Sequence, residues 1–275
     1  MAGSGKIQAL PDRRFGQQLG GLSGECIPVR ADRADQELAR NSIPASQCCA
    51  SSGQRRDWDA VDAYYDHLLL WDNERRQIAG AYRLAKTERL MPEQIYSSTL
   101  FNYPRPPQQC LPASAELGRS FLLPEYWRGR GLDLLWCGIG QWVGRNNVRY
   151  LFGPVSMPGT FSGRAKSAIV RYFLNHYATD NPLGAARLPF VEVRDDLPPL
   201  TGDAAQDMMV LKQILKEEGV MLPPLFRKYT AVTKPGGTNF HAFNVDPDFC
   251  DSVDGLVVVD LEQVDPKFAR RYLGG

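Results

Sequence analysis

The chain has 275 residues, of which 43% are hydrophobic and 23% are charged. These proportions are typical of a soluble globular protein of one or two domains, and they exclude disordered, fibrous and collagen-like chains. The 32 basic and 31 acidic side chains leave a net charge of +1, which argues against a general nucleic-acid-binding protein with its broad basic surface. We therefore expect no nucleic-acid partner.

The first 56 residues are expected to form an irregular N-terminal arm, with a short helix near residues 34–41. They are rich in glycine, serine and glutamine and show no sustained hydrophobic period. The arm lacks the apolar core of a secretory signal, and no apolar run approaches the ~20 residues of a membrane-spanning helix. We expect a cytoplasmic protein with one ordered domain over residues 57–275.

The first half of this domain contains alternating strand and helix patterns. Short apolar runs at 68–71 and 77–84 flank a polar turn and predict a β-hairpin. Residues 114–123 predict a strand, the apolar stripe from Leu132 to Val143 predicts an amphipathic helix, and residues 149–156 predict another strand. A strand–helix–strand crossover of this kind normally joins two parallel neighbouring strands.

The second half is expected to close the sheet. Helices are predicted at 162–176 and 204–219, the second one ended by Gly219. Short strands are predicted at 190–193, 229–232, 240–245 and 256–261.

Positive charge is concentrated in the centre of the chain. Between Arg119 and Arg171 there are eight basic and two acidic residues. Two interpretations remain open: a solvated basic face, or a docking face for a phosphate-bearing or acidic partner.

A glycine- and arginine-rich loop lies between the predicted strand and the predicted amphipathic helix. Helix N-termini bind phosphates through unpaired N–H groups, glycines allow close approach to the backbone, and arginines add charge-assisted hydrogen bonds. We expect this loop to hold the phosphate of a cofactor-like substrate. Its candidate binding residues are Arg128, Gly129, Arg130, Gly131 and Leu132.

The order of these segments resembles the core of the GNAT acyltransferases. The resemblance is carried by residues 115–124 (AELGRSFLLP), 126–132 (YWRGRGL) and 150–153 (YLFG), and by 57–62 (DWDAVD) further upstream. These pieces are most similar to the hemolysin-like branch, which includes ornithine–acyl carrier protein N-acyltransferases of aminolipid synthesis. The resemblance covers roughly residues 57–255. It implies an α/β fold of the GNAT type, with a mixed central sheet flanked by helices.

The same segments are similar to the acyl-homoserine-lactone synthases, which share this fold. The matching charged residues are Asp59, Asp62, Arg83, Glu116 and Arg119. The resemblance implies that they surround the amine substrate and the reacting centre, with Asp59, Asp62 and Arg83 binding the substrate and Glu116 and Arg119 acting catalytically. Two other interpretations stay open: Glu116 and Arg119 as a structural ion pair, and the two aspartates as residues of a turn or a helix start.

The implied reaction is attack of an amine on a thioester. Glu116 is the candidate base that removes the amine proton, directly or through a water. A backbone N–H near Phe121, Leu122 or Leu123 is the candidate donor to the developing oxyanion.

The resemblance implies an N-acyltransferase that moves a fatty acyl group, in some cases 3-hydroxylated, to the amine of an amino acid such as ornithine. The acyl donor is acyl carrier protein or coenzyme A, no cofactor is bound permanently, and peripheral contact with the inner membrane face is expected. The three widely spaced histidines predict no metal site. Two alternatives remain: a synthase of acyl-homoserine-lactone signals, and a non-catalytic module that binds acyl carriers.

Overall fold

The computed structural model describes residues 24–30, 59–193 and 197–273. Strands from these ranges form a seven-stranded sheet in the order β1-β2-β3-β5-β6-β9-β8. Every neighbouring pair in it is antiparallel except β5 and β6. The strands are β1 Gly24–Arg30, β2 Asp66–Asp72, β3 Gln77–Lys86, β5 Ser114–Leu122, β6 Tyr150–Met157, β8 Thr238–Asp246 and β9 Ser252–Asp260.

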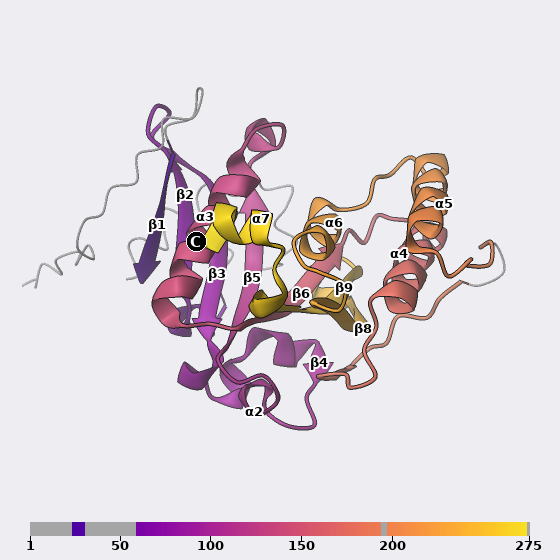
Figure 1. Ribbon diagram of the computed structural model, residues 1–275, viewed down its shortest axis with the longest axis horizontal. Coiled ribbons are helices and arrows are strands. Elements are labelled where there is room, and N and C mark those ends of the chain that lie inside the picture. The colour runs from indigo at the N-terminus through magenta and orange to yellow at the C-terminus, as the bar shows by residue number, and fades with distance from the viewer. Residues whose placement is uncertain (1–23, 31–58, 194–196, 274–275) are drawn as a thin grey trace, which may run out of the picture.

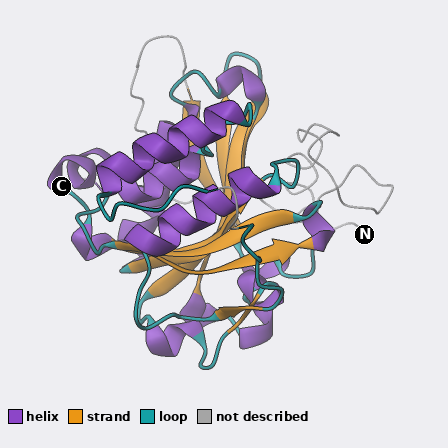
Figure 2. Cartoon of the chain, turned by 90° about the vertical axis from the view of Figure 1, so that its right-hand side faces the viewer, coloured by secondary structure: helices purple, strands orange, loops and turns teal. Residues whose placement is uncertain are grey.

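Helices and short elements cover both faces of this sheet (Figure 1). Figure 2 shows the long helices lying together against one face of the twisted sheet. None of the helices in the described ranges is long and apolar enough to span a bilayer. The longer helices are α3 Gly131–Asn146, α4 Gly163–His176, α5 Ala204–Glu217 and α6 Pro224–Ala231. They are followed by α7 Pro266–Phe268 and the short π-helix η8 Ala269–Leu273.

Short elements cover the opposite face. There β4 Phe101–Asn102 pairs with β7 Ala185–Ala186, next to the short helix α2 Pro107–Cys110. The 3-10 helices η1 Asp62–Tyr64 and η4 Tyr96–Thr99 lie on this same face of the sheet. One buried cluster lies between the sheet and the long helices, and a second, which includes Tyr65, Ile95 and Phe101, lies beneath the short elements.

The predicted α/β class and most of the predicted elements are confirmed. The hairpin is β2–β3, the crossover is β5–α3–β6, and β5 pairs with β6 in parallel. The predicted strand at 229–232 is wrong, because this stretch ends helix α6 and places Tyr229 against Trp136 of α3. The predicted strand at 190–193 is also absent; those residues carry no regular element.

The expected N-terminal arm contains a strand. Residues 24–30 pair antiparallel with β2 and form β1 at the edge of the sheet. An edge strand is one of the few places where a proline such as Pro28 is compatible with a sheet. The remainder of the arm, including the helix expected near 34–41, lies outside the described residues.

Strands β5 and β6 pair over a short stretch and then part. Their parallel register runs from Ser114 opposite Tyr150 to Glu116 opposite Phe152. Beyond this point β5 continues along β3 and β6 continues along β9. The sheet therefore opens between β5 and β6, and both strands expose backbone groups there that need new partners.

A bulge lies in β5 immediately after this opening. Arg83 of β3 faces Gly118 and Ala81 faces Phe121, so Tyr82 alone stands opposite Arg119 and Ser120. Two residues opposing one define a β-bulge, which leaves the extra residue outside the ladder of hydrogen bonds. The left-handed backbone of Arg119, with φ of 43°, is part of this irregularity.

Gly153 marks the point where β6 leaves β5. Its φ is +154°, and a Cβ atom there would lie 2.1 Å from the backbone oxygen of Leu117. We expect Gly153→Ala to lower the free energy of unfolding by about 2–4 kcal/mol, because neither backbone can yield without breaking strand pairing. Urea denaturation measures this change.

Gly144 in α3 is the matched control, because a Cβ added there meets no atom within 4 Å. Gly144→Ala should leave stability unchanged or raise it by up to about 1 kcal/mol. Equal effects of the two substitutions would contradict the close approach of β5 and β6.

Candidate active site

A buried arginine organises a cluster of charged side chains at the end of β3. Arg83 Nη1 donates to Asp59 Oδ2 and to Asp62 Oδ1, both at 2.8 Å. The arginine is only 1% exposed. Its guanidinium lies between the rings of Tyr65 and Tyr96, 4.7 Å from each ring centroid. Such stacking is favourable for a desolvated cation.

Arg119 connects β5 to this cluster. Its Nε and Nη2 donate to Asp59 Oδ2 at 3.2 and 2.9 Å. Burial alone would raise the pKa of Asp59, but Arg83 and Arg119 together lower it below its usual value. Asp59 is therefore an anion held between two guanidinium groups, suited to binding a cation and poorly suited to accepting a proton.

Glu116 lies on the same side of the sheet but deeper. Its side chain is 1% exposed. Its carboxylate accepts hydrogen bonds from the Tyr65 hydroxyl, from Tyr96 N at 2.9 Å and from Ser97 N at 2.7 Å. Burial raises its pKa, against the effect of these donors. The carboxylate thus fixes the start of η4 and the two tyrosines that enclose Arg83.

The structure brings the five predicted charged residues together, although they are spread over 61 positions of the sequence from 59 to 119. The open alternative of a direct Glu116–Arg119 ion pair is wrong, because Arg119 turns to Asp59 and Glu116 turns to Tyr65. The alternative of a turn role for Asp59 is correct in part, since its Oδ1 accepts from the backbone N–H of Asp62 at 3.0 Å. It holds the turn and the arginines at once.

One edge of Arg83 offers further donors. Within the described part of the chain, neither its Nε nor its Nη2 has a hydrogen-bond partner. A buried donor without a partner costs free energy, of the order of 1–3 kcal/mol, and more when the group is charged. An anionic or carbonyl oxygen placed at this edge would recover that cost.

The predicted oxyanion donors at the end of β5 are only partly available. Leu123 N donates to Ala79 O at 2.8 Å, so this N–H is already used, and that part of the prediction is wrong. Phe121 and Leu122 pair with Ala81 and Gly80 of β3. The ladder between β3 and β5 is interrupted earlier, at the bulge.

The loop before α3 has the geometry expected of an anion site. Arg128, Gly129 and Arg130 are exposed, and helix α3 begins at Gly131 with no side chain capping its first turn. Leu132 follows in that turn. The N–H groups of a first helical turn have no partner within the helix and carry a partial positive charge.

Tyr126 holds this loop in place. Its buried hydroxyl donates to Asp72 Oδ2 at 2.5 Å and accepts from Gln77 Nε2 at 3.1 Å. Trp127 donates its indole N–H to Leu122 O at 2.7 Å while its ring remains exposed. The loop is therefore anchored to β2, β3 and β5, and Gly129 stays open to solvent while Gly131 is buried.

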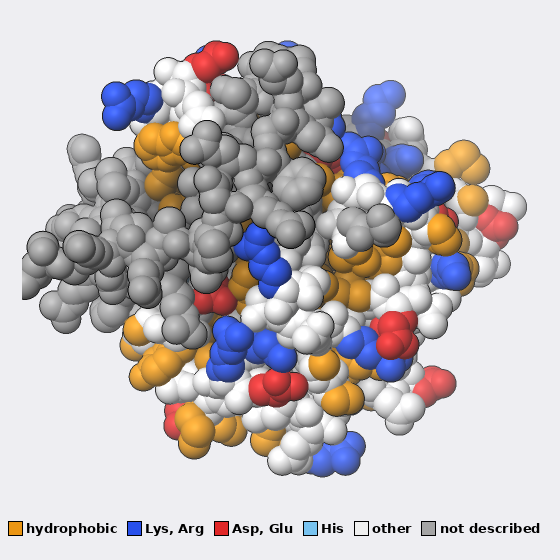
Figure 3. Space-filling view, turned by 60° about the vertical axis from the view of Figure 1, so that its left-hand side comes forward, with side chains coloured by type: hydrophobic (Ala, Val, Ile, Leu, Met, Phe, Trp, Pro, Cys, Tyr) orange, Lys and Arg blue, Asp and Glu red, His pale blue; other side chains and the backbone are white. Residues whose placement is uncertain are grey.

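The basic centre of the sequence does not become one continuous basic surface. Arg149 pairs with Asp260 and Glu262, and Arg164 pairs with the carboxylates at the end of α5. On the face shown in Figure 3, Lys and Arg side chains of the described residues are interspersed with acidic and hydrophobic ones. The excess positive charge that reaches solvent near the α3 loop comes from Arg128 and Arg130, for which no described residue is an ion-pair partner.

Sequence reasoning missed several residues near the cluster. Tyr65 and Tyr96 enclose Arg83 but carry no motif, because a tyrosine between two apolar stretches is also common in ordinary cores. Asp246 and Asp254 lie on β8 and β9, close enough to influence the pKa of Tyr96. No group of three or more His, Cys, Asp or Glu in the described ranges could hold a metal.

Asp254 is a buried acid on the sheet. It is 2% exposed and accepts hydrogen bonds from Ser156 and, at 3.2 Å, from Ser252. Burial and the neighbouring Asp246 raise its pKa to about 6. The group therefore binds a proton more tightly in the native state than in the unfolded chain.

Comparison with known proteins gives matches that agree with one another. The sequence model of the acetyltransferase (GNAT) domain matches residues 45–137. The chain is 28% identical over 236 residues to the L-ornithine N(alpha)-acyltransferase of Agrobacterium fabrum, covering 80% of this chain and 73% of that protein. It is 26% identical over 196 residues to the glycine N(alpha)-acyltransferase of Phocaeicola vulgatus, covering 64% of this chain and only 60% of that protein. These matches confirm the resemblance found in the sequence.

Solved structures overlap with this fold only partially. A CoA-dependent acyl-homoserine lactone synthase, BjaI, crystallised with SAM and isopentyl-CoA, has a TM-score of 0.36 at 15% identity, covering 69% of this chain and 83% of that one. TofI in an apo form has a TM-score of 0.45 at 10% identity, covering 90% of this chain and 95% of that one.

Asp254→Asn tests the buried acid. Because the pKa of Asp254 is raised, its charged form destabilises the fold, and this cost grows as the pH rises from roughly 4 to about 6. Near pH 8 the variant should be more stable than wild type by up to about 3 kcal/mol, and near pH 4 the difference should vanish. Urea denaturation at a series of pH values measures this.

The exposed Asp180 supplies the control. Asp180→Asn makes the same chemical change at the surface and should leave the stability curve close to that of wild type. A stabilisation by Asp254→Asn that does not depend on pH would show that the carboxylate is not the cause.

Proposed function

We propose that this chain, which carries a GNAT acetyltransferase domain and is related to N(alpha)-acyltransferases, transfers a fatty acyl group from a thioester to the α-amine of an amino acid. The observation that carries the proposal is the cluster of Asp59, Asp62, Arg83 and Arg119 next to the β5 bulge. It sets charges of both signs beside a strand whose backbone is open to a thioester. The acyl group proposed is a 3-hydroxylated fatty acid, and the product is a lyso-aminolipid.

The charged cluster suits a zwitterionic acceptor. An ammonium group pairs with carboxylates and a carboxylate pairs with guanidinium. Asp59 and Arg119 are both about a quarter exposed, at 24% and 25% of their side chains, so they form the accessible rim of the cluster. Glycine and ornithine, the substrates in the names of the two relatives, share an α-amine and an α-carboxylate. Ornithine is our first choice, because the ornithine enzymes match more of this chain.

The donor is expected to lie along the opening between β5 and β6. A pantetheine arm carries amide groups that can pair with the backbone of strands that have parted. Its phosphate would reach the first turn of α3, where the helix N-terminus, Arg128 and Arg130 offer positive charge. Both acyl carrier protein and coenzyme A end in such a phosphate-linked arm, and we favour acyl carrier protein as the partner.

The proposed reaction forms one bond and breaks one. The neutral amine attacks the thioester carbon, a C–N bond forms, and the C–S bond then breaks to release the thiol, which takes up a proton. The amine must lose protons for this, and the transient oxyanion needs a donor. We assign the donor role to a backbone N–H of β5 near Phe121 or Leu122.

Glu116 is placed in this proposal as a positioning residue. Its carboxylate is bonded to Tyr65, Tyr96 and Ser97 and is almost completely buried. A base has to be within hydrogen-bond reach of the proton it removes, directly or through one water. That Glu116 removes the amine proton stays a prediction, and it requires relay through the Tyr65 hydroxyl.

The function is tested with purified protein and a matrix of substrates. Acyl carrier protein and coenzyme A thioesters are each offered with ornithine, glycine and S-adenosylmethionine, and products are identified by mass spectrometry. We expect an N-acyl amino acid, formed fastest with ornithine and acyl carrier protein. Release of an acyl-homoserine lactone, or no product from any pair with folded protein, would overturn the proposal.

The acceptor site is tested by Asp59→Asn. This change removes the anion between Arg83 and Arg119, and kcat/KM for the amino acid should fall by about 100-fold, about 3 kcal/mol of transition-state binding. Asp180→Asn is again the control and should leave kcat/KM unchanged. Unaltered kinetics of Asp59→Asn would place the acceptor elsewhere.

Glu116→Gln separates a base from a positioning residue. The amide keeps the shape of the side chain but cannot accept a hydrogen bond from both N–H groups and the Tyr65 hydroxyl. As a positioning residue, Glu116 should yield a variant with a lower melting temperature, a raised KM for the amino acid and an unchanged pH dependence of kcat. Loss of the acidic limb of that profile with an unchanged KM would instead identify Glu116 as the base.

A further inference from the structure

An apolar cavity lies on the other face of the sheet from the charged cluster. Its volume is about 50 Å³. A smaller cavity of about 10 Å³ lies next to it and reaches Gly153, where β6 leaves β5. The two cavities share Leu117, Leu151, Tyr229 and Val259. Space therefore runs from the opening between β5 and β6 into the core beneath α3 and α6.

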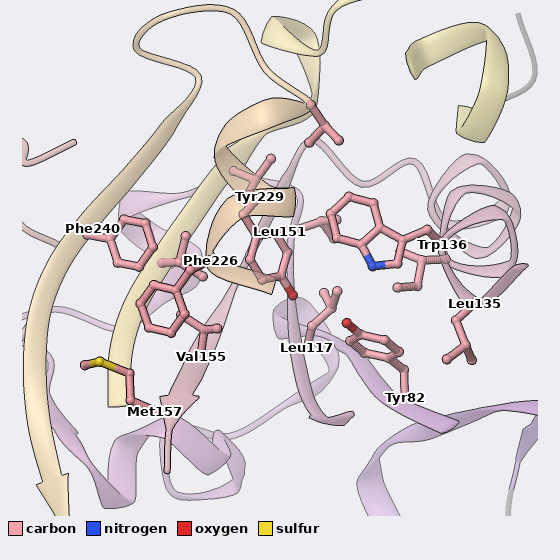
Figure 4. Close-up of a cluster of buried hydrophobic side chains, with 14 of the residues drawn as sticks. Tyr82, Leu117, Leu135, Trp136, Leu151, Val155, Met157, Phe226, Tyr229 and Phe240 are labelled. Atoms are coloured by element: carbon pink, nitrogen blue, oxygen red, sulfur yellow. The ribbon is translucent and has the colours of Figure 1, made fainter. Parts of the chain in front are cut away.

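Most walls of the larger cavity are apolar side chains of the sheet and of these two helices. Figure 4 shows Trp136 of α3 and Tyr229 of α6 side by side, with Leu117 of β5 below them. The centroids of the two rings are 5.3 Å apart. An apolar space suits the acyl chain of the proposed donor, because the chain leaves water when it enters. With the thioester at the opening between β5 and β6, the chain runs from there into the cavity.

One wall of the cavity comes from a later part of the sequence. We call residues 266–273, which form α7 and η8, the strap; it lies beside α3 (Figure 1). Tyr272 and Leu273 of the strap line the larger cavity only, whereas Gly153 lines the smaller one only. The strap therefore closes the end of the space that lies away from the β5–β6 opening.

The strap lies directly on the backbone of α3 at Gly140. A Cβ atom at this position would be 1.7 Å from the backbone oxygen of Tyr272, which is far closer than any real contact. Only glycine at position 140 therefore allows the strap to lie where it does, because glycine permits the closest approach of another backbone.

Side chains on α3, α6 and the strap hold this arrangement together. The Asp133 carboxylate accepts a hydrogen bond from the Tyr272 hydroxyl at 2.9 Å, and it also accepts from Arg271 and from Lys228 of α6. Solvent reaches this cluster, since 28% of the Asp133 side chain and 45% of the Arg271 side chain are exposed. Accessible ion pairs contribute little free energy. The strap is thus the most easily displaced wall, because the others are paired strands and packed helices of the core.

The larger cavity is small for a fatty acyl chain. A space of about 50 Å³ holds about four groups of the size of a water molecule or a methylene, since each needs roughly 10–15 Å³. A hexadecanoyl chain has many more methylene groups than this, so its far end reaches the strap. A much shorter chain ends before it.

We propose that the strap is the end wall of the acyl-chain pocket, and that its contact with Gly140 sets the length of acyl chain that the protein transfers. The inference rests on the proposed function and adds the residues that determine chain length. A long chain has to lift the strap from α3, so the strap lowers kcat/KM for long donors more than for short ones.

The test compares hexadecanoyl and decanoyl thioesters of the same carrier in competition for transfer. Gly140→Ala should raise the hexadecanoyl-to-decanoyl ratio of kcat/KM by about 10-fold over wild type, because the added methyl group displaces the strap. Leu273→Ala should raise the same ratio several-fold, because it shortens the end wall while the strap keeps its place on α3.

Gly144→Ala is the matched control. It makes the same change one turn further along α3, where a Cβ meets no atom within 4 Å, and it should keep the wild-type ratio. A higher ratio in Gly140→Ala or Leu273→Ala, with none in Gly144→Ala, would support the proposal. An unchanged ratio in both strap variants, or an equal rise in Gly144→Ala, would overturn it.

A binding measurement keeps the inference separate from catalysis. Calorimetric titration gives the affinities of free hexadecanoic and decanoic acid for wild type, Gly140→Ala and Leu273→Ala. A shift in relative affinity toward hexadecanoic acid in the variants would support the end wall even if no amine were acylated. The same relative affinity in all three proteins would contradict it even if transfer occurred.

Discussion

The buried guanidinium of Arg83 is the constraint on which the site depends. A cation taken out of water is expensive unless anions and stacking partners surround it. Here Asp59 and Asp62 neutralise one edge, and Tyr65 and Tyr96 cover both faces. These four residues come from the segment before β2 and from the turns after β3. The arginine therefore holds these segments together, along with the hydrogen bonds that Glu116 accepts from Tyr65 and Tyr96. The accessible rim of the site follows from this arrangement.

Strand β5 separates two chemically different environments. Glu116 faces the charged cluster beneath the short elements, and Leu117 faces the apolar cavity beneath α3 and α6. Alternate residues of a strand point to opposite faces, so β5 presents the charged cluster on one side and the apolar cavity on the other. Under the proposed function, the thioester lies where β5 parts from β6, between these two sides.

The fold was predictable wherever hydrophobic period and turn chemistry agreed. The apolar stripe from Leu132 to Val143 correctly predicted helix α3, and the glycine-rich loop before it correctly predicted where that helix begins. Prediction failed at Tyr229, where a β-prone run of tyrosine, threonine and valine ends helix α6. It failed for two reasons. Pro224 occupies the first turn of a helix, where proline is tolerated, and the side chains of Phe226 and Tyr229 on that helix pack into the core against α4 and α3. Tertiary packing overrides a local preference of this size.

The amino-acid sequence by itself determined the β2–β3 hairpin, the β5–α3–β6 crossover, helices α4 and α5 and, through resemblance, which five charged residues belong together. Only the tertiary structure decided what each of them touches. Spacing along the chain says nothing about depth, so it could not show that Glu116 is sealed behind tyrosines while Asp59 and Arg119 reach solvent.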